Sequence, residues 1–390
     1  MGQRQEVAAH TVAVQARGSG LMPIVVDLFC GVGGFSLGAF RAGFEVVAAV
    51  DNDPRVAAAF RRNFPTCPMV TEDISKLDGK RIVDQAGPRG GRLDGIIGGP
   101  PCQGFSYIGR RRVDDKRNHL FESFFRIVSE LKPTFFVAEN VTGILSDKYA
   151  HYREDAVARV PGYTVLDPVI LKSSDFGAPT TRSRVFFVGF LQNSVARLSS
   201  EDFQPAERVE HITVGDALRG LPTKIHPGWQ SSDSGWRKLD WRGEGWFWER
   251  SYEKIPPDVG DAEAIQRLRE QGEVSGCQGT RHSEAVAKRF SELQEGEVDR
   301  PSRARRLDRK GLCPTIRSGT GPEHGSHQAV RPIHPTQPRV ITPREAARLQ
   351  GFPDWFQFDG TKWHSFRQIG NSVSPILAEA VLTAIAKRLY

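Results

Sequence analysis

Cysteine is scarce in this 390-residue chain, and its placement argues against two classes of protein. The five cysteines are an odd number, they are widely spread, and no two of them form a CxxC pair: Cys30, Cys67, Cys102, Cys277 and Cys313. This spacing indicates neither a disulfide framework nor a zinc cluster. We therefore expect free thiols, one of which is available as a nucleophile.

The sequence also lacks long apolar runs and an export signal. Its first residues, MGQRQEVAAH, are polar and contain no signal-peptide core. No segment reads as long and apolar enough to cross a membrane. We expect a protein that remains in the cytoplasm, at the nucleoid, without contact to membranes.

Length and charge permit a large soluble protein with a polyanionic partner. A chain of 390 residues with 39% hydrophobic and 25% charged residues predicts one larger and one smaller domain. The net charge is +7 and the pI is about 9.2. Six basic residues against one acid stand in RPSRARRLDRK, 300–310. A solvated loop would carry the same charges, so this cluster alone does not establish a nucleic-acid partner.

Short apolar runs alternate with helical stretches in the first half of the chain. Strands are predicted at 23–29, 45–50, 94–99 and 134–140, and helices at 36–44, 54–64 and 119–132. Asp53 and Pro54 have the character of an N-cap and a first helical residue. This alternation predicts an α/β fold with a parallel, doubly wound sheet. The segment 184–190 closes this regular half of the chain.

Composition changes after about residue 190, and regularity returns near residue 339. Five tryptophans crowd into 229–248, and glycine, proline, serine and arginine are common as far as residue 338. We expect a smaller, irregular domain at 191–338. A T-x-x-E capping box, Thr342 to Glu345, then opens a helix at 343–350, and 375–389 is an amphipathic helix. This last helix is expected to pack back on the first domain, 23–190, and residues 1–22 precede that domain as an extension.

A glycine-rich turn and two acids indicate a nucleotide-like ligand. In DLFCGVGGFSLG, 27–38, three glycines separate a strand from a helix and let a ligand approach the backbone. Neither G-x-G-x-x-G nor a GK[ST] phosphate loop is present. Asp51 ends the next strand, where it can accept hydrogen bonds from a ribose, and Asp73 can meet an adenine amino group. Together these residues suit an adenosine-containing ligand without a long phosphate chain.

A second group of residues suits nucleophilic chemistry at the same sheet edge. GGPPCQGFS, 98–106, places Cys102 after a strand and two prolines that restrain the backbone. Glu139 ends another strand, and Arg182 and Arg184 alternate where 184–190 begins. A structural cysteine, a helix-capping acid and a surface arginine pair are the simpler interpretations. GNSVSP, 370–375, is a further polar turn before the last helix.

Taken in order, DLFCGVGG, GGPPCQGFS, ENV, RSRVFFVG, TPREAARLQGFP and GNSVSP resemble the motif series of the DNA (cytosine-5)-methyltransferases of restriction-modification systems. The resemblance covers roughly 23–190 and 339–390. The segment 191–338 falls where that family carries its target-recognition domain. The implied fold is the Rossmann-like sheet of class I methyltransferases, with the recognition domain inserted before the C-terminal motifs.

The resemblance implies S-adenosylmethionine as cofactor, no metal, and a covalent mechanism. Cys102 would attack C6 of cytosine, Glu139 would protonate or hydrogen-bond N3, and Arg184 would contact O2 with Arg182 supporting it. The implied cofactor residues are Phe29, Gly31, Gly33, Gly34, Asp51, Asn52, Asp73, Ile74, Pro100, Asn371 and Val373. The family usually has glutamine where this chain has Thr180, which puts the local loop positioning in question.

The implied substrate is duplex DNA, from which the cytosine is flipped out. Expected DNA contacts are Gln103, Ser106, Arg110 and Arg111 beside the nucleophile, and Arg303, Arg305, Arg306 and Arg317 in the middle region. The first three arginines of that middle group are expected on phosphates, and Arg317 in a groove. We expect a monomer, with a cognate restriction endonuclease as a functional partner and not as a stable subunit.

Two other interpretations remain open from the sequence. An RNA cytosine-5 methyltransferase would share the architecture, although the chain lacks the CFT tripeptide expected of the tRNA-methylating relative. A catalytically silent DNA-binding protein would keep the fold, although intact Cys102, Glu139 and Arg184 argue against it. The recognition sequence cannot be derived from the sequence, because direct readout depends on side-chain geometry.

Overall fold

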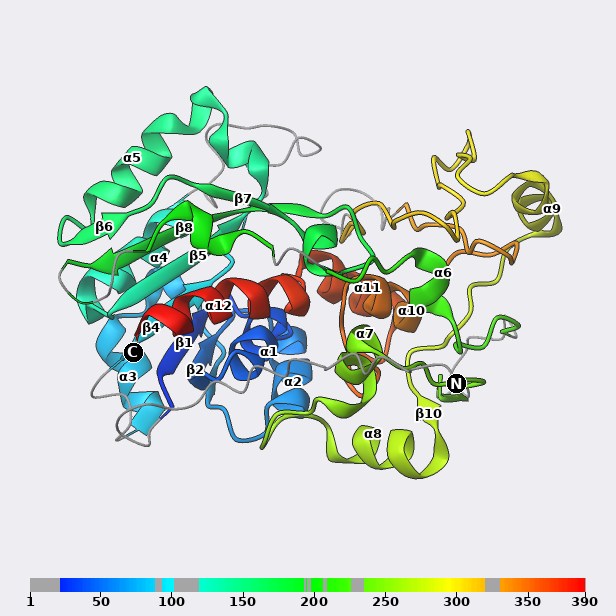
Figure 1. The fold of residues 1–390 in the computed structure, drawn as a ribbon, viewed down its shortest axis with the longest axis horizontal. Helices are drawn as coiled ribbons and strands as arrows, with labels where there is room; N and C mark the ends of the chain where they lie inside the picture. The colour runs from blue at the N-terminus through cyan, green and yellow to red at the C-terminus, as the bar shows by residue number, and fades with distance from the viewer. Residues whose placement is uncertain are drawn as a thin grey trace, which may run out of the picture.

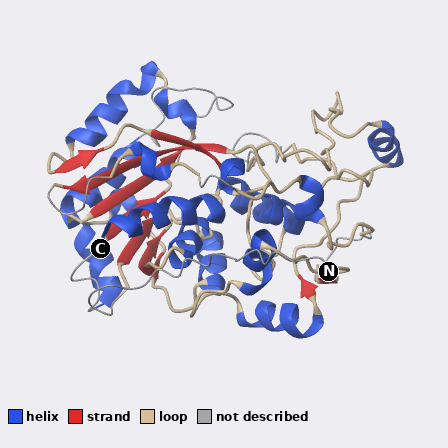
Figure 2. Cartoon of the chain, in the orientation of Figure 1, coloured by secondary structure: helices blue, strands red, loops and turns tan. Residues whose placement is uncertain are grey.

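The computed structural model describes residues 22–87, 93–101, 119–192, 194, 198–205, 209–225, 235–319 and 330–389. A central sheet flanked by helices occupies one side of the molecule, and mostly loops with short helices occupy the other (Figures 1 and 2). The two sides correspond to the regular and irregular parts of the sequence.

Five parallel strands form the main part of the sheet, in the order β3-β2-β1-β4-β5. They are β1 (Ile24–Leu28), β2 (Glu45–Val50), β3 (Met69–Val70), β4 (Gly95–Gly98) and β5 (Phe135–Asn140). Four of them match the predicted strands closely, because buried parallel strands are continuous apolar runs that are easy to recognise. Their carboxyl ends meet at one edge of the sheet.

The other edge of the sheet is antiparallel. It contains β6 (Tyr163–Val165), β7 (Val169–Lys172) and β8 (Ser183–Leu191), and β8 lies between β5 and β6 with opposite direction to β5. The predicted parallel sheet is thus confirmed for β1 to β5, and β8, which contains 184–190, pairs antiparallel with its neighbours. A short connection through η6 (Ser173–Phe176) joins β7 to β8, and a connection without a crossover helix permits antiparallel pairing only.

Helices cover both faces of the sheet, as a doubly wound fold requires. One face carries α1 (Gly34–Arg41), α2 (Pro54–Asn63) and α12 (Pro375–Leu389); the other carries α3 (Gly79–Ala86), α4 (His119–Leu131) and α5 (Ala150–Ala158). Asp53 caps α2 and Pro54 opens it, as predicted. The helix α12 runs along α1 (Figure 1), and a Cβ built on Gly38 would lie 2.4 Å from that of Ala378.

The irregular part combines short elements with long loops. Its helices are α6 (Val214–Leu218), α7 (Trp246–Trp248), α8 (Ala262–Gln266) and α9 (Glu284–Glu292), and β9 (Arg237–Lys238) pairs with β10 (Glu273–Val274). The predicted capping box of Thr342 and Glu345 is confirmed at the start of α10 (Pro343–Leu349). Helix α11 (Lys362–Asn371) then leads to α12.

One stretch corrects the expectation about membranes. Lys362–Leu389, which spans α11 and α12, is long and apolar enough to cross a membrane by length and composition. Of its most apolar window, 67% is buried inside the protein. A core helix that packs on other helices can be as apolar as a membrane span, and the burial of this window accounts for its apolar composition.

Candidate active site

The turn between β1 and α1 is shaped by left-handed backbone conformations. Phe29, Gly31 and Gly33 have φ angles of 57°, 56° and 94°. Nothing lies within 4 Å of a Cβ built on Gly31, so the turn leaves open space beside its backbone. A bulky residue such as Phe29 seldom adopts positive φ, which is typical of functional turns.

Asp51, at the end of β2, holds this turn. Its two carboxylate oxygens accept hydrogen bonds from the backbone N–H of Gly31 and of Asp53, each at 3.0 Å. Burial raises the pKa of Asp51, and these backbone donors oppose that rise. The neighbouring Asn52 is exposed. An acid at this position faces the same sheet edge as the glycine-rich turn.

Asp73 and Ile74 follow β3 at the same edge. The Oδ1 atom of Asp73 accepts hydrogen bonds from the N–H of Ser75 at 2.9 Å and from its hydroxyl at 2.8 Å. These hydrogen bonds lower the pKa of Asp73. Ile74 begins the 3-10 helix η1 (Ile74–Lys76) and is buried. The cap thus fixes the carboxylate at the end of the third strand.

The prolyl loop begins where β4 ends. A Cβ on Gly98 would lie 2.3 Å from the carbonyl oxygen of Leu28, so β4 must pass close to β1. Pro100 is buried, and its carbonyl oxygen accepts a hydrogen bond from Nδ2 of Asn140 at 3.3 Å. Asn140 is a residue that the sequence analysis did not assign. Cys102, Gln103, Ser106, Arg110 and Arg111 lie outside the described residues.

The remaining cysteines are unsuited to nucleophilic attack. Cys30, Cys67, Cys277 and Cys313 are free and buried. Burial raises the pKa of each of these thiols, because it disfavours the charged thiolate. This argument concerns these four cysteines alone, because Cys102 lies outside the described residues.

Glu139 and Arg184 are brought together by antiparallel pairing of β5 with β8. The Oε1 atom of Glu139 lies 2.7 Å from Nε of Arg184, and their side chains are only 9% and 12% exposed. A Cβ on Gly99, next to Pro100, would lie 3.4 Å from Oε2 of Glu139. The acid and the arginine therefore lie beside the start of the loop that carries Cys102.

Arg182 has a different set of contacts. It is buried, and its Nη1 and Nη2 donate hydrogen bonds to the carbonyl oxygens of Gly370 and Ser372, each at 2.9 Å. Its predicted role was the support of Arg184, and these contacts were not predicted from the sequence. The nearby Thr180 is buried as well, and its backbone forms a β-bridge with Cys313. This bridge holds the loop at Thr180, the position where the family usually has glutamine.

The C-terminal turn, residues 370–373, lies directly on the glycine-rich turn. A Cβ on Gly34 would lie 2.1 Å from Oγ of Ser372 and 2.3 Å from the carbonyl oxygen of Val373. Val373 is buried, and its Cγ2 lies 3.9 Å from the Cβ position of Gly99. Asn371, the last residue of α11, is exposed. Segments more than 330 residues apart in the sequence thus meet at one place (Figure 1).

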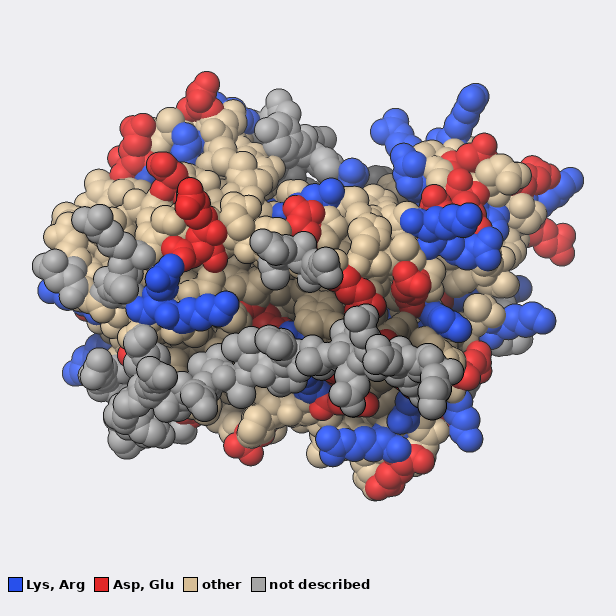
Figure 3. All heavy atoms as spheres, viewed as in Figure 1, with Lys and Arg blue, Asp and Glu red and all other residues tan. Residues whose placement is uncertain are grey.

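The predicted DNA-contacting arginines of the middle region fall into different environments. Arg303 and Arg305 are exposed, and Arg305 donates to the carbonyl oxygen of Gly296 at 2.6 Å. Arg306 is half-buried and donates to the carbonyl oxygens of Pro335, Phe290 and Leu293, which is a structural role. Arg317 is exposed. Lysine and arginine gather with some acids over α9 and the following loop (Figure 3).

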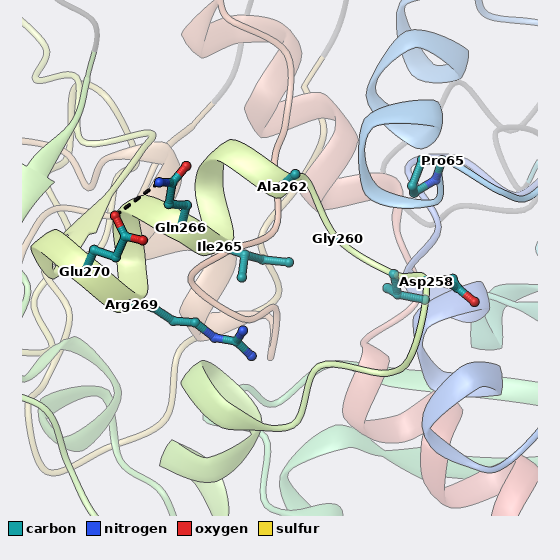
Figure 4. A pocket seen from close by; sticks show the side chains of 9 residues that line it. Pro65, Asp258, Gly260, Ala262, Ile265, Gln266, Arg269 and Glu270 are labelled. Atoms are coloured by element: carbon teal, nitrogen blue, oxygen red, sulfur yellow. Dashed lines mark hydrogen bonds between the residues drawn. The ribbon is translucent and has the colours of Figure 1, made fainter.

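A surface hollow lies away from these residues. It is lined by Pro65 at the end of α2 and by residues of the 258–270 segment, with Ile265 and Arg269 on its wall (Figure 4). The hydrogen bond from Gln266 to Glu270 closes one side at 3.1 Å. None of the residues predicted for the active site lines this hollow.

Comparison with known proteins identifies the family. The family model described as C-5 cytosine-specific DNA methylase matches residues 24–387. The Type II methyltransferase M.XorII of Xanthomonas oryzae is 40% identical over 94% of this chain and 85% of its own length. M1.HphI of Haemophilus parahaemolyticus is 33% identical over 93% of this chain and 86% of its own length.

Solved structures agree. A candidate DNA modification methyltransferase encoded within a prophage of E. coli is 49% identical, with a TM-score of 0.85 over 94% of this chain and 99% of its own. Dnmt2 of S. pombe shares the fold, at 19% identity and a TM-score of 0.59 over 94% of this chain and 98% of its own.

The chain belongs to the C-5 cytosine-specific DNA methylases. It is a DNA (cytosine-5)-methyltransferase of the restriction-modification type. The predicted family and activity are confirmed, and the interpretations as an RNA methyltransferase and as a catalytically silent protein are set aside. The Rossmann-like fold is confirmed as well.

Proposed function

We propose that the enzyme methylates C5 of a flipped-out cytosine through a covalent bond between Cys102 and C6, with S-adenosylmethionine as methyl donor. The observation that carries this proposal is the buried Glu139–Arg184 pair beside Gly99 and Pro100. An acid and a guanidinium at the base of the prolyl loop are the groups that a cytosine needs at N3 and O2 when its C6 is attacked.

The cofactor residues fit an adenosine-containing methyl donor. Open space beside Gly31, the fixed carboxylate of Asp51 and the capped carboxylate of Asp73 lie at successive strand ends. Val373 and Pro100 add apolar surface nearby. When bound, S-adenosylmethionine supplies an electrophilic methyl group. In the described ranges, no group of three His, Cys, Asp or Glu is placed to hold a metal.

The protein side chains divide the chemistry among them. The Cys102 thiolate adds to C6, and the electron pair of the C5–C6 bond becomes available at C5. Glu139 donates a proton or hydrogen bond at N3 and Arg184 donates at O2, so that negative charge does not accumulate on the ring. After C5 is methylated, water takes the C5 proton, the C5–C6 double bond re-forms as the thiolate leaves, and any proton on N3 returns to Glu139.

The domain boundaries and partners belong to the same proposal. Residues 23–190 and 339–390 carry the catalytic site, and 191–338 recognise duplex DNA. Exposed Arg303, Arg305 and Arg317 favour this role, whereas the hydrogen bonds of Arg306 to backbone carbonyls favour a structural one. A monomer acting beside a cognate restriction endonuclease in the cytoplasm completes the proposal.

The proposal predicts that Cys102→Ser abolishes methyl transfer and retains cofactor binding. A serine hydroxyl without a base beside it is a far poorer nucleophile than a thiolate. Transfer of tritium from labelled S-adenosylmethionine to duplex DNA measures the first property, and titration with S-adenosylhomocysteine the second. Transfer by the variant at a rate near that of the wild type would refute the role of Cys102. Transfer RNA as the acceptor serves as the negative control.

A further inference from the structure

The C-terminal turn is held by two side chains from distant parts of the chain. Arg182, just before β8, donates two hydrogen bonds to the carbonyl oxygens of Gly370 and Ser372. Gln350, at the end of α10, donates from Nε2 to the same Ser372 oxygen at 3.1 Å. Both side chains are buried. Buried carbonyls that lose their donors pay a desolvation cost, so these contacts fix where the turn lies.

The two hydrogen bonds of Arg182 depend on the planar shape of its guanidinium. Its two terminal nitrogens reach carbonyls that are two residues apart, and each hydrogen bond is 2.9 Å long. A lysine ammonium keeps the charge but does not have a rigid fork of two parallel donors. A lysine at 182 therefore does not reproduce the two parallel hydrogen bonds that fix the positions of Gly370 and Ser372.

The opposite side of the turn touches the cofactor residues. Ser372 and Val373 lie against Gly34 so closely that no Cβ fits there, and Val373 also approaches Gly99. Gly370 is equally tight against the backbone of Arg317 and Ser318, 2.6 Å from the Ser318 nitrogen to its Cβ position. Because residues 370–373 are tightly packed on both sides, a shift of this turn must change the space beside the glycine-rich turn.

We propose that Arg182 and Gln350 are positioning residues of the cofactor site, which act through the turn at 370–373 and not through the cytosine. The proposal rests on the proposed use of S-adenosylmethionine. It moves Arg182 from the support of Arg184 to the cofactor side and gives Gln350 a role that the sequence did not indicate.

The test is calorimetric titration of the full-length protein with S-adenosylhomocysteine in the absence of DNA. Arg182→Lys and Gln350→Leu are each expected to raise the dissociation constant about tenfold, the change that loss of one or two buried hydrogen bonds produces. In steady-state assays the KM for S-adenosylmethionine should rise more than kcat falls. Affinity of the cofactor-free protein for duplex DNA should stay unchanged.

Arg153→Lys is the matched control. Arg153 also donates to two carbonyl oxygens, those of Ile144 and Ser146, at 2.6 and 3.1 Å, but on the α5 side of the sheet. The Arg153→Lys variant should have a lower melting temperature, as Arg182→Lys should, and an unchanged affinity for S-adenosylhomocysteine.

Three results would overturn the proposal. Arg182→Lys and Gln350→Leu could bind S-adenosylhomocysteine as tightly as Arg153→Lys does, which refutes this proposal alone. Arg182→Lys could instead lower DNA affinity and leave cofactor affinity intact, which would return Arg182 to the support of Arg184 at the base. A wild-type protein that binds no S-adenosylhomocysteine would refute the proposed cofactor, and this proposal with it.

Discussion

At the scale of single residues, Asp27 is a buried acid whose effect on the free energy of unfolding depends on pH. It lies in β1, where Oγ of Ser36 donates to its Oδ2 at 2.5 Å, and Oδ1 has no hydrogen-bond partner among the described residues. Burial raises its pKa from 3.8 to about 7. As pH rises through this window, the unfolded chain ionises first, so Asp27 destabilises the fold increasingly up to about pH 7.

We predict that Asp27→Asn removes this pH dependence. The amide is neutral at every pH and keeps an oxygen that can accept from Ser36. As pH rises from about 5 to about 8, the unfolding free energy of the wild type should therefore fall relative to that of the variant, by an amount on the order of a few kcal/mol. Urea unfolding across this range measures it. Parallel stability curves for the two proteins would contradict the assignment.

At the scale of elements, the sequence predicts the parallel strands well and the antiparallel edge poorly. The strands β1, β2, β4 and β5 are buried on both faces and show as continuous apolar runs. The short β6 and β7 are partly exposed, and β7 alternates buried with exposed residues. Their pairing with β8 is set by contacts that local sequence does not encode.

The site was predicted in the same uneven way. Motifs at strand ends predicted that Asp51, Asp73 and Glu139 lie at one edge of the sheet, because the carboxyl ends of its parallel strands converge. Arg184 reaches Glu139 from near the start of the antiparallel strand β8. Gln350 and the true contacts of Arg182 escaped prediction, since both depend on how α10 and α11 return to the sheet. Hydrogen bonds between residues more than 20 apart leave no local pattern in the sequence.

The segment 300–319 carries a prediction about recognition. Arg305 is exposed in a basic loop, and Arg317 is exposed next to the buried Ile316 beside the C-terminal turn. Arg305→Ala should weaken binding to all duplexes alike and reduce the salt slope by about one phosphate's share. Arg317→Ala should weaken the cognate site selectively, by about 1–3 kcal/mol.

Fluorescence anisotropy with cognate and random duplexes at several salt concentrations distinguishes the two roles. Equal losses on both duplexes for Arg317→Ala would exclude it as a base reader. If Arg305→Ala binds duplex DNA as tightly as the wild type, the loop that carries Arg305 does not contact DNA. Arg306→Ala is not a useful comparison, because its guanidinium holds the backbone of α9 and residue 335.

At the scale of the whole molecule, the sheet and the irregular part are in contact at several places, and one of these contacts lies beside the candidate active site. Thr181 donates to the carbonyl oxygen of Cys313 at 2.9 Å, and Gly370 packs on Arg317 and Ser318. The proposed recognition segment therefore touches both the residues just before β8, the strand of Arg184, and the turn beside the cofactor residues. This placement allows one bound DNA to engage all three.

The covalent bond between Cys102 and cytosine is the central claim, and trapping tests it most directly. A duplex with 5-fluorocytosine at the target, mapped beforehand by bisulfite sequencing, is incubated with enzyme and S-adenosylmethionine. Because fluorine cannot leave C5 as a proton does, the adduct should persist and give a shifted band on a denaturing gel, absent for Cys102→Ser. Methylation of the normal duplex without any shifted band on the fluorinated one would contradict attack at C6.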